Sequence, residues 1–295
     1  MSTIPSTPAR TVPASPAGLL GAGPSTLQGP RVDGSGLSFP RLVRSEWLKL
    51  RTLRSTWITL GAAVLVLILA AGLIANHLHG NLVNPQPGDG HDPGDLDVLA
   101  APFRGFGITQ LVIGVLGVLT VSGEYATGMI RASFIAVPTR LPVLAAKVVV
   151  FAAIAFAAML LASLGAFFVA QGVLGSYGVG LGTGHSVRIV FGLAGFLALV
   201  GVLGLGIGFI VRSTAGGVAA LVGILLVAPG ILAALGASWA ASASHYLPLN
   251  AGQSMFSDQV NTDGTLSPLG GLITMVGWVA AAVTGAAIMV TRRDA

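Results

Sequence analysis

The sequence has no cysteine, and only 8% of its 295 residues are charged. Without cysteine, the chain can form neither a disulfide framework nor a thiolate metal site or nucleophile. The scarcity of charge, together with 54% hydrophobic residues and a mean hydropathy of +0.86, excludes an ordinary soluble domain. The composition therefore predicts a membrane protein.

Six uncharged stretches are long enough to cross about 30 Å of hydrocarbon as helices that rise about 1.5 Å per residue. They predict membrane spans at residues 58–76, 106–121, 148–170, 189–211, 216–235 and 271–290. We therefore expect an all-α polytopic membrane protein whose six-helix transmembrane domain covers residues 58–291. Segment 1–38 is rich in Pro, Ser, Thr and Gly and has no apolar periodicity, which predicts a disordered cytoplasmic tail.

The basic residues are distributed unevenly along the chain. When the spans alternate from a cytoplasmic start, all but two of the 15 lysines and arginines fall on the inner side. The exceptions are Arg104 and Arg188, each just before a span, where a long side chain can reach the headgroups. The positive-inside rule therefore places both termini, including residues 292–295, in the cytoplasm. This distribution attributes the net charge of +5 to contact with the lipid bilayer and not with nucleic acid.

Groups that carry chemistry are also scarce. No Asp, Glu, Lys, Arg or His lies in the middle of a predicted span, which disfavours a self-powered, ion-coupled pump. The nucleotide-binding pattern G-x-x-x-x-G-K-[ST] is absent, since the only lysines are Lys49 and Lys147. The histidines and aspartates of the outer segment 77–97 match no calcium or zinc spacing, which favours a hydrated loop over a metal site. We therefore expect no enzyme activity, cofactor or metal in this chain.

Small residues and one proline predict how the spans pack. Gly204 and Gly208 form a small-xxx-small pair that lets helix backbones approach closely, either within the chain or at a subunit interface. Pro229 and Gly230 interrupt the fifth span and predict a kink there.

Residues 39–57 predict an amphipathic interface helix that lies on the inner membrane surface before the first span. At about 100° per residue, most of its apolar side chains share one arc and most of its basic side chains the other. Glu46 and Arg54 fall within the apolar arc. Two interpretations are open. Either these residues contact polar groups of another protein element, or they reach water at the edge of the face, with Glu46 paired to Lys49 or Arg51.

The first inner loop, residues 122–140, reads SGEYATGMIRASFIAVPTR. If it is helical from Glu124, then Glu124, Thr127, Gly128 and Arg131 form one polar stripe, and Pro138 ends the helix. A short amphipathic helix of this kind suits docking in the groove of a partner protein. The alternative is a passive connector between two spans.

Three motifs, taken together, resemble the membrane permease of the type-2 ATP-binding-cassette (ABC) exporters. They are EWLKLRTLRSTW before the first span, G-E-Y-x-x-G-x-I-R-x-S-x-x-x-x-P-x-R-x-x-x-x-x-A-K before the third, and LPLNAG in the last outer loop. The resemblance covers nearly all of residues 41–293, including the six-span layout. It does not extend to the first forty residues.

The resemblance implies an assembly of two permeases and two ABC ATPases, in which ATP and Mg²⁺ are bound by the ATPase subunits. In such an assembly the interface helix and a short coupling helix in the first inner loop contact the ATPases. The resemblance implies that the coupling region contains Glu124, Tyr125, Gly128, Arg131, Pro138 and Arg140. It implies that the interface helix contributes Glu46, Trp47, Lys49, Arg51 and Arg54.

The expected function is that of a permease subunit that exports an unidentified substrate with energy from a separate ATPase. The second permease is either another copy of this chain or a paralogue. Many arginines, few lysines and abundant Ala and Gly are typical of a GC-rich bacterial genome, which indicates a bacterial cytoplasmic membrane. The alternative is a self-contained channel or facilitator, or a membrane scaffold, without an ATPase partner.

Overall fold

The computed structural model describes residues 38–84, 98–130, 133, 140–182, 185–257 and 265–292. These residues form helices joined by turns, with no strand among them. Six helical stretches are long and apolar enough to span a membrane: Arg54–Val83, Ala101–Ala126, Leu141–Tyr177, Ser186–Val211, Thr214–Leu235 and Pro268–Arg292. Each contains one predicted span, so the predicted all-α, six-span architecture is confirmed. Residues 1–37 and 293–295 of the predicted cytoplasmic ends lie outside the described residues.

The first two helices meet at a bend. Helix α1 (Phe39–Thr52) ends before Leu53, whose backbone is extended with φ −79° and ψ 105°, and α2 (Arg54–Val83) follows directly. The indole N–H of Trp57 donates to the carbonyl oxygen of Arg51 at 3.0 Å, and so satisfies an acceptor freed at the end of α1. The interface helix predicted over residues 39–57 is therefore shorter than expected, because this bend turns the chain into the first span.

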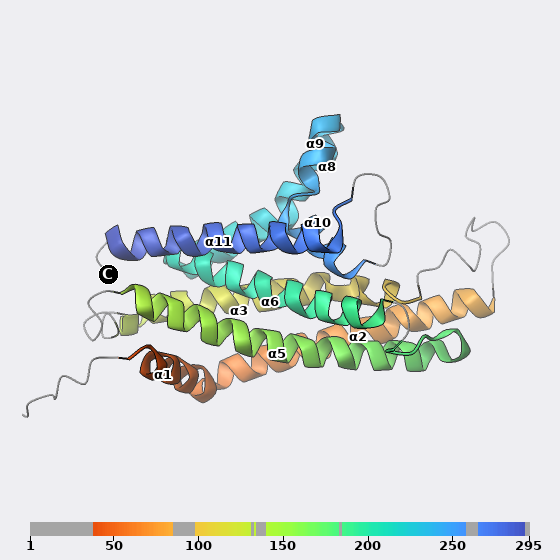
Figure 1. Ribbon diagram of the computed structural model, residues 1–295, viewed down its shortest axis with the longest axis horizontal. Helices are drawn as coiled ribbons and strands as arrows, with labels where there is room; N and C mark the ends of the chain where they lie inside the picture. Colours follow the sequence, from red (N-terminus) through yellow and green to blue (C-terminus); the bar gives the residue numbers. More distant parts are fainter. Residues whose placement is uncertain are drawn as a thin grey trace, which may run out of the picture. The chain divides into compact units, whose positions relative to one another are not determined.

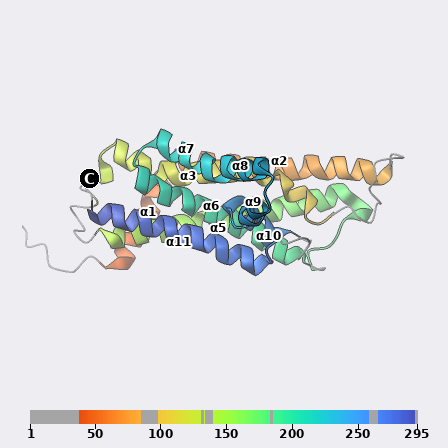
Figure 2. The same cartoon turned by 90° about the horizontal axis from the view of Figure 1, so that it is seen from above.

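Helix α6 (Ser186–Val211) lies at the centre of the helix bundle. It packs against α3 (Phe106–Ala126), α5 (Leu141–Leu174) and α11 (Pro268–Arg292), as Figures 1 and 2 show. Helix α2 packs mainly against α5 and also contacts α3. Helix α6 is accordingly the most deeply buried of the six spans: 78% of its most apolar 18-residue stretch lies inside the protein.

Glycines allow α3 and α6 to approach each other closely. A Cβ atom on Gly204 would collide with the carbonyl oxygen of Gly114, and one on Gly117 with the carbonyl oxygen of Gly201. No side chain fits at these crossing points, so the two backbones pack directly against each other. Gly208 also faces α3, where an added Cβ would lie 3.0 Å from the carbonyl oxygen of Val118. Of the two locations predicted for the Gly204 and Gly208 pair, the structure shows packing within the chain.

The fifth span is irregular around its proline. It consists of α7 (Thr214–Val222), a π-helical turn (Gly223–Val227) and α8 (Ala228–Leu235). Within the turn the N–H of Ala228 bonds the carbonyl oxygen of Gly223, five residues back. Pro229 follows immediately and has no N–H of its own, so the wider turn occurs where a regular helix would lose a bond. The kink predicted at Pro229 is accommodated by this turn.

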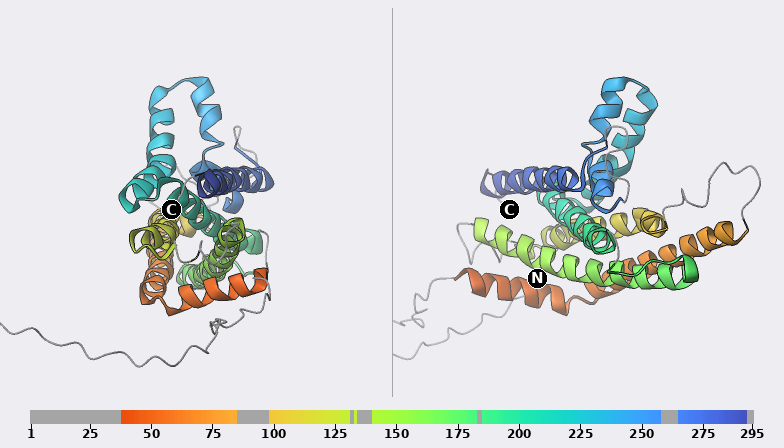
Figure 3. Two further views of the ribbon diagram at one scale, coloured as in Figure 1. Left: turned by 90° about the vertical axis from the view of Figure 1, so that its left-hand side faces the viewer. Right: turned by 45° about the vertical axis from the view of Figure 1, so that its right-hand side comes forward.

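Helix α8 continues into an outer pair of helices. Helices α8 and α9 (Ser238–Ser244) pack on each other and stand out from the other helices (Figure 3). Helix α10 (Pro248–Phe256) follows and packs against α6 and α11. Short 3-10 turns at Ala101–Gly105 and Gly175–Tyr177 complete the described helical elements.

One end of the bundle gathers the segments that the charge distribution places in the cytoplasm. Helix α1, the end of α3, the start of α5 and the ends of α6 and α11 all lie toward this end, on the left in Figure 1. We call it the inner end. Both predicted contact segments, the interface helix and the first inner loop, therefore lie at the same end of the bundle.

Candidate functional site

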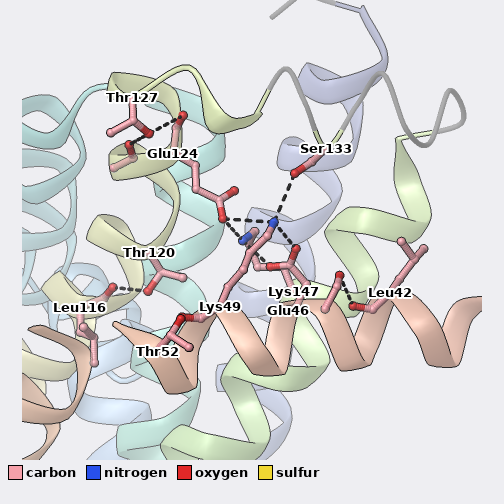
Figure 4. A network of polar contacts seen from close by, with 12 residues as sticks. Leu42, Glu46, Lys49, Thr52, Leu116, Thr120, Glu124, Thr127, Ser133 and Lys147 are labelled. Carbon is pink, nitrogen blue, oxygen red and sulfur yellow. Dashed lines mark hydrogen bonds and ion pairs between the residues drawn. The ribbon is translucent and has the colours of Figure 1, made fainter. Parts of the chain in front are cut away.

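Four charged residues from three helices meet at the inner end (Figure 4). The ammonium Nζ of Lys147 on α5 lies 2.6 Å from Glu46 Oε2 on α1 and 2.7 Å from Glu124 Oε1 on α3. Lys49 Nζ on α1 lies 2.7 Å from Glu46 Oε1 and 3.6 Å from Glu124 Oε1. We call these four residues the ion-pair network. It contains both lysines of the chain and two of its acids.

The helical spacing of α1 explains how it joins the network. Glu46 and Lys49 are three residues apart and therefore neighbours on one side of the helix. Glu46 also shares the buried face with Leu42 and Leu50, four residues to either side. This face packs against α5, so this part of the apolar arc of α1 meets protein. Glu46 can therefore lie within the apolar arc of α1, because it faces Lys147 of α5.

Burial makes the network energetically important. Glu46 is 3% exposed, Lys147 is 1% exposed and Glu124 is 8% exposed, whereas Lys49 is only half-buried. Desolvating ions is costly, and two positive charges beside two negative ones offset that cost through short contacts. Removing one member of a buried ion pair typically costs about 3–5 kcal/mol, because its partner is left as an uncompensated charge. The network therefore holds α1, α3 and α5 in one arrangement.

The pKa values of the two α1 residues show that the lysine and carboxylate contacts outweigh burial. Burial alone raises the pKa of Glu46, but the charges and hydrogen bonds of Lys147 and Lys49 lower it below its usual value of 4.5. Burial alone lowers the pKa of Lys49, but its hydrogen bond to Glu46 and the charges of Glu124 and Glu46 raise it above 10.5. Both groups are therefore charged at neutral pH.

The first inner loop begins with a turn and not with a continuous helix. Helix α3 ends at Ala126, and the N–H of Gly128 donates to the carbonyl oxygen of Tyr125 at 3.3 Å. Gly128 has a φ of +72°, which a right-handed helix cannot contain. The predicted helix from Glu124 through Gly128 to Arg131 is therefore wrong at this turn. Residues 131–132 and 134–139, which include Arg131 and Pro138, lie outside the described residues.

The far end of the loop is attached to the last helix. Arg140 precedes α5 and donates from Nη1 to the carbonyl oxygen of Val290 at 3.1 Å. Arg212, at the end of α6, donates from Nη2 to the carbonyl oxygen of Met289 at 2.9 Å. Carbonyls at a helix C-terminus carry partial negative charge, so both guanidiniums are well placed there. We call Arg140 and Arg212 the arginine clamp.

The two attachments leave the loop anchored on both sides. Glu124 holds its first side through the ion-pair network, and Tyr125 lies beneath Arg212, whose guanidinium is 5.1 Å from the centre of the tyrosine ring. Arg140 holds its second side through α11. Within the loop, Ser133 Oγ accepts a hydrogen bond from Lys49 Nζ at 3.2 Å, which joins the loop to α1.

The structure divides the predicted contact residues into two groups. Trp47, Arg51, Arg54 and Gly128 are exposed, and Trp47 exposes 42% of its surface at the inner end. Glu46 and Glu124 are buried, and their carboxylates face lysines of the same chain and not the surroundings. Of the two interpretations of Glu46, the structure supports contact with another protein element, since Lys147 belongs to α5, and also shows the local pair with Lys49.

Lys147 and Arg212 are two residues of the site that were not among the expected contact residues, although Lys147 ends the second of the three motifs. The position of Lys147 in the sequence did indicate an ion pair. A lysine side chain near the start of a long apolar helix needs an acid nearby if it points into the protein. The identity of that acid was not readable, because Glu46 lies 101 residues away in the chain. Arg212 gave no such signal, since its acceptor is a backbone carbonyl.

The fold and the site together define a polytopic, all-helical membrane protein with charged attachments at its inner end. A family model described as ABC-2 family transporter protein matches residues 42–228, more than half of the chain. The chain belongs to this family and is a permease component of an ABC transporter, a class of protein that works with an ABC ATPase. None of the curated proteins compared with the chain matches it.

Proposed function

We propose that this chain is the permease subunit of a bacterial ABC exporter in the cytoplasmic membrane. It moves a substrate outward with energy from ATP and Mg²⁺ bound to a separate ATPase subunit. Membership of the ABC-2 family supports the ATPase partnership. The observation that carries the proposal is the ion-pair network, since it links α1 and the first inner loop to the membrane helices α3 and α5.

The network gives an external push a direct route into the membrane domain. A displacement of α1 that separates Glu46 from Lys147 also separates Lys49 from Glu124, and so divides the buried network into two smaller pairs, Glu46 with Lys49 and Lys147 with Glu124. Each buried charge then loses one of its partners, which is unfavourable. A displacement in which α1, α3 and α5 move together avoids this cost. A push on α1 or on the loop therefore moves the inner ends of three helices as a unit.

The exposed and buried residues take different roles in this proposal. Trp47, Arg51 and Arg54 lie on the exposed surface of α1 and the start of α2, and with Gly128 they form the surface offered to the ATPase. Arg131 and Pro138 are proposed members of the same surface from their place in the loop. Glu46 and Glu124 are positioning residues that hold this surface against the spans. Tyr125 and Arg140 attach the loop to α6 and α11.

Association with the ATPase tests this assignment. We expect Arg51→Glu, which reverses an exposed charge on α1, to reduce co-purification of the ATPase subunit severalfold. The matched control is Arg104→Glu, an exposed arginine on the predicted outer side. If no ATPase associates with the wild-type chain, and the chain alone in liposomes passes solute without nucleotide, then the channel alternative replaces the proposal.

A second permease chain is part of the proposed assembly. In the fifth span, only 11% of the most apolar 18-residue stretch is buried within this chain. Ile231 on α8 is among its exposed residues. We place the second permease against this span. Because the sequence has no cysteine, Ile231→Cys introduces a single thiol that can form only an intermolecular disulfide. We expect oxidised dimers with Ile231→Cys and none with Leu73→Cys, an exposed position on α2. The reverse pattern would place the subunit contact elsewhere.

A further inference from the structure

Both arginines of the clamp have a strained backbone. Among the residues that the structure describes, Arg140 and Arg212 are the non-glycine residues with a positive φ, at 53° and 57°. A positive φ is unfavourable for a residue that carries a Cβ atom and ordinary for glycine. Strain of this kind persists only where other contacts offset it, and it is frequent in clamps and switch regions.

Each arginine stands at the end of a helix. Arg212 follows α6, and its N–H donates to the carbonyl oxygen of Gly208 at 2.9 Å. Glycine is the usual residue at such a left-handed position after a helix. Arg140 precedes α5, and its carbonyl oxygen accepts from the N–H of Val143 at 3.2 Å. Since glycine would avoid the strain at both positions, the contacts of the guanidiniums have to offset it.

The two guanidiniums converge on the last turn of α11. Arg140 donates to the carbonyl oxygen of Val290, and Arg212 donates to that of Met289. Helix α11 ends at Arg292, and the carbonyl oxygens of a last turn have no donor within their own helix. Two strained residues from different helix ends therefore bind successive carbonyls of one helix.

The packing of α11 beside the clamp is light. Its buried residues in this half are Ala282, Ala286 and Val290, two of which are alanines that bury little apolar area. A Cβ atom on Gly206 of α6 would lie 2.8 Å from that of Ala282, so α6 and α11 touch through small groups. Little apolar contact is therefore lost when the inner end of α11 moves.

The clamp opens more easily than the ion-pair network. Three of the four charged residues of the network are almost fully buried, so separating them leaves ions away from water. Arg140 and Arg212 are only half-buried, and the carbonyl oxygens of a helix end can bond water instead. Opening also relieves the strain at both arginines. When the inner ends of the helices move, the clamp therefore separates before the network does.

We propose that the arginine clamp is a strained latch on α11. In the described structure the latch is closed, and Arg140 and Arg212 are positioning residues that hold the inner end of α11 beside α5 and α6. In the open state both guanidiniums leave α11, whose inner end swings away while the network still joins α1, α3 and α5. That a push on the first inner loop opens the latch rests on the proposed function, but the latch itself does not.

Distances between two spin labels measure the latch in the full-length chain alone. Because the sequence has no cysteine, Ser45→Cys on α1 and Thr291→Cys on α11 introduce the only thiols to be labelled. Both positions are exposed, and α1 and α11 lie on opposite sides of α5 (Figures 1 and 3). An open latch therefore gives a longer distance than a closed one in double electron–electron resonance of the chain in nanodiscs.

Alanine and glycine variants separate the strain from the guanidinium contact. Arg212→Ala and Arg212→Gly both lose the contact, but only glycine adopts the positive φ of the closed state without strain. We expect more open chains in both than in the wild type, and a closed-to-open ratio roughly 5- to 30-fold higher for Arg212→Gly than for Arg212→Ala. The same pair of variants at Arg140 gives a second measurement.

Arg104→Ala and Arg104→Gly are the matched controls, since Arg104 is exposed and its φ is not positive. They should leave the distances unchanged. Wild-type distances in the clamp variants, or equal ratios in the alanine and glycine variants, would overturn the latch.

The complete complex tests how the latch is used. When an ATPase subunit assembles with the labelled chain, ATP should raise the longer-distance population severalfold. An assembled complex in which ATP leaves the distances unchanged would overturn the use of the latch in transport and leave the proposed function standing. If no ATPase assembles, the proposed function fails, and the distances in the chain alone still decide whether the latch exists.

Discussion

Replacing Lys147 with methionine removes the ammonium that Glu46 and Glu124 share, and it keeps most of the side chain's length and apolar stem. Breaking a buried ion pair typically costs about 3–5 kcal/mol. We expect a loss near the lower limit, about 3 kcal/mol, because Lys49 stays 2.7 Å from Glu46 and 3.6 Å from Glu124. Glu124 loses its closest partner and bears most of the cost.

Equilibrium unfolding in mixed micelles measures this change in the free energy of unfolding. Arg104→Met is the matched control, since it removes an exposed basic side chain and should change stability by less than about 0.5 kcal/mol. The triple variant Lys147→Met, Glu46→Gln and Glu124→Gln removes the buried charges together and should recover most of the loss. If Lys147→Met costs no more than the control, or if the triple variant is no more stable than the single one, then the buried charges do not stabilise the fold in this way.

Three further predictions concern pH, packing and the arginine clamp. The stability that Glu46 and Lys49 add should be constant between pH 4.5 and 10.5, the unperturbed values of the two groups. This stability should be lost as pH falls through the lowered pKa of Glu46 or rises through the raised pKa of Lys49. The check is the free energy of unfolding of wild type and of Glu46→Gln, measured as a function of pH. Gly204→Ala should destabilise by about 1–3 kcal/mol through its backbone collision, whereas Gly230→Ala, with open space around its Cβ, should not; thermal unfolding separates them. Arg212→Gln should speed amide hydrogen exchange at the end of α11 about tenfold, and unchanged exchange would show that the clamp does not hold this helix.

The sequence was sufficient for the spans, because length and hydropathy alone require them. It was less informative about α1, since an apolar arc suits either lipid or another helix, and lipid tails are as apolar as leucine. Glu46 and Arg54 within the arc indicated protein contact. The structure shows such a contact for Glu46, whose partner lies far along the chain, whereas Arg54 is exposed.

The first inner loop shows a different limit. The stripe predicted from Glu124 to Arg131 relied on helical spacing, but it included Gly128, which adopts a positive φ and ends α3. Glycine in a short helical pattern is a recognised signal of a break, and it could have shortened the prediction. Arg140 and Arg212 bond backbone carbonyl oxygens, which every residue has. The residue types at the accepting positions therefore could not predict these contacts.

We propose that the ion-pair network transmits movement from the ATPase to the membrane helices. The most direct measurement is the ATPase rate of the complete complex with the wild-type chain and with the triple variant that lacks the buried charges. We expect the triple variant still to bind the ATPase subunit but to lose most of the dependence of ATP hydrolysis on the permease. A triple-variant complex that hydrolyses ATP with wild-type dependence on the permease would contradict it.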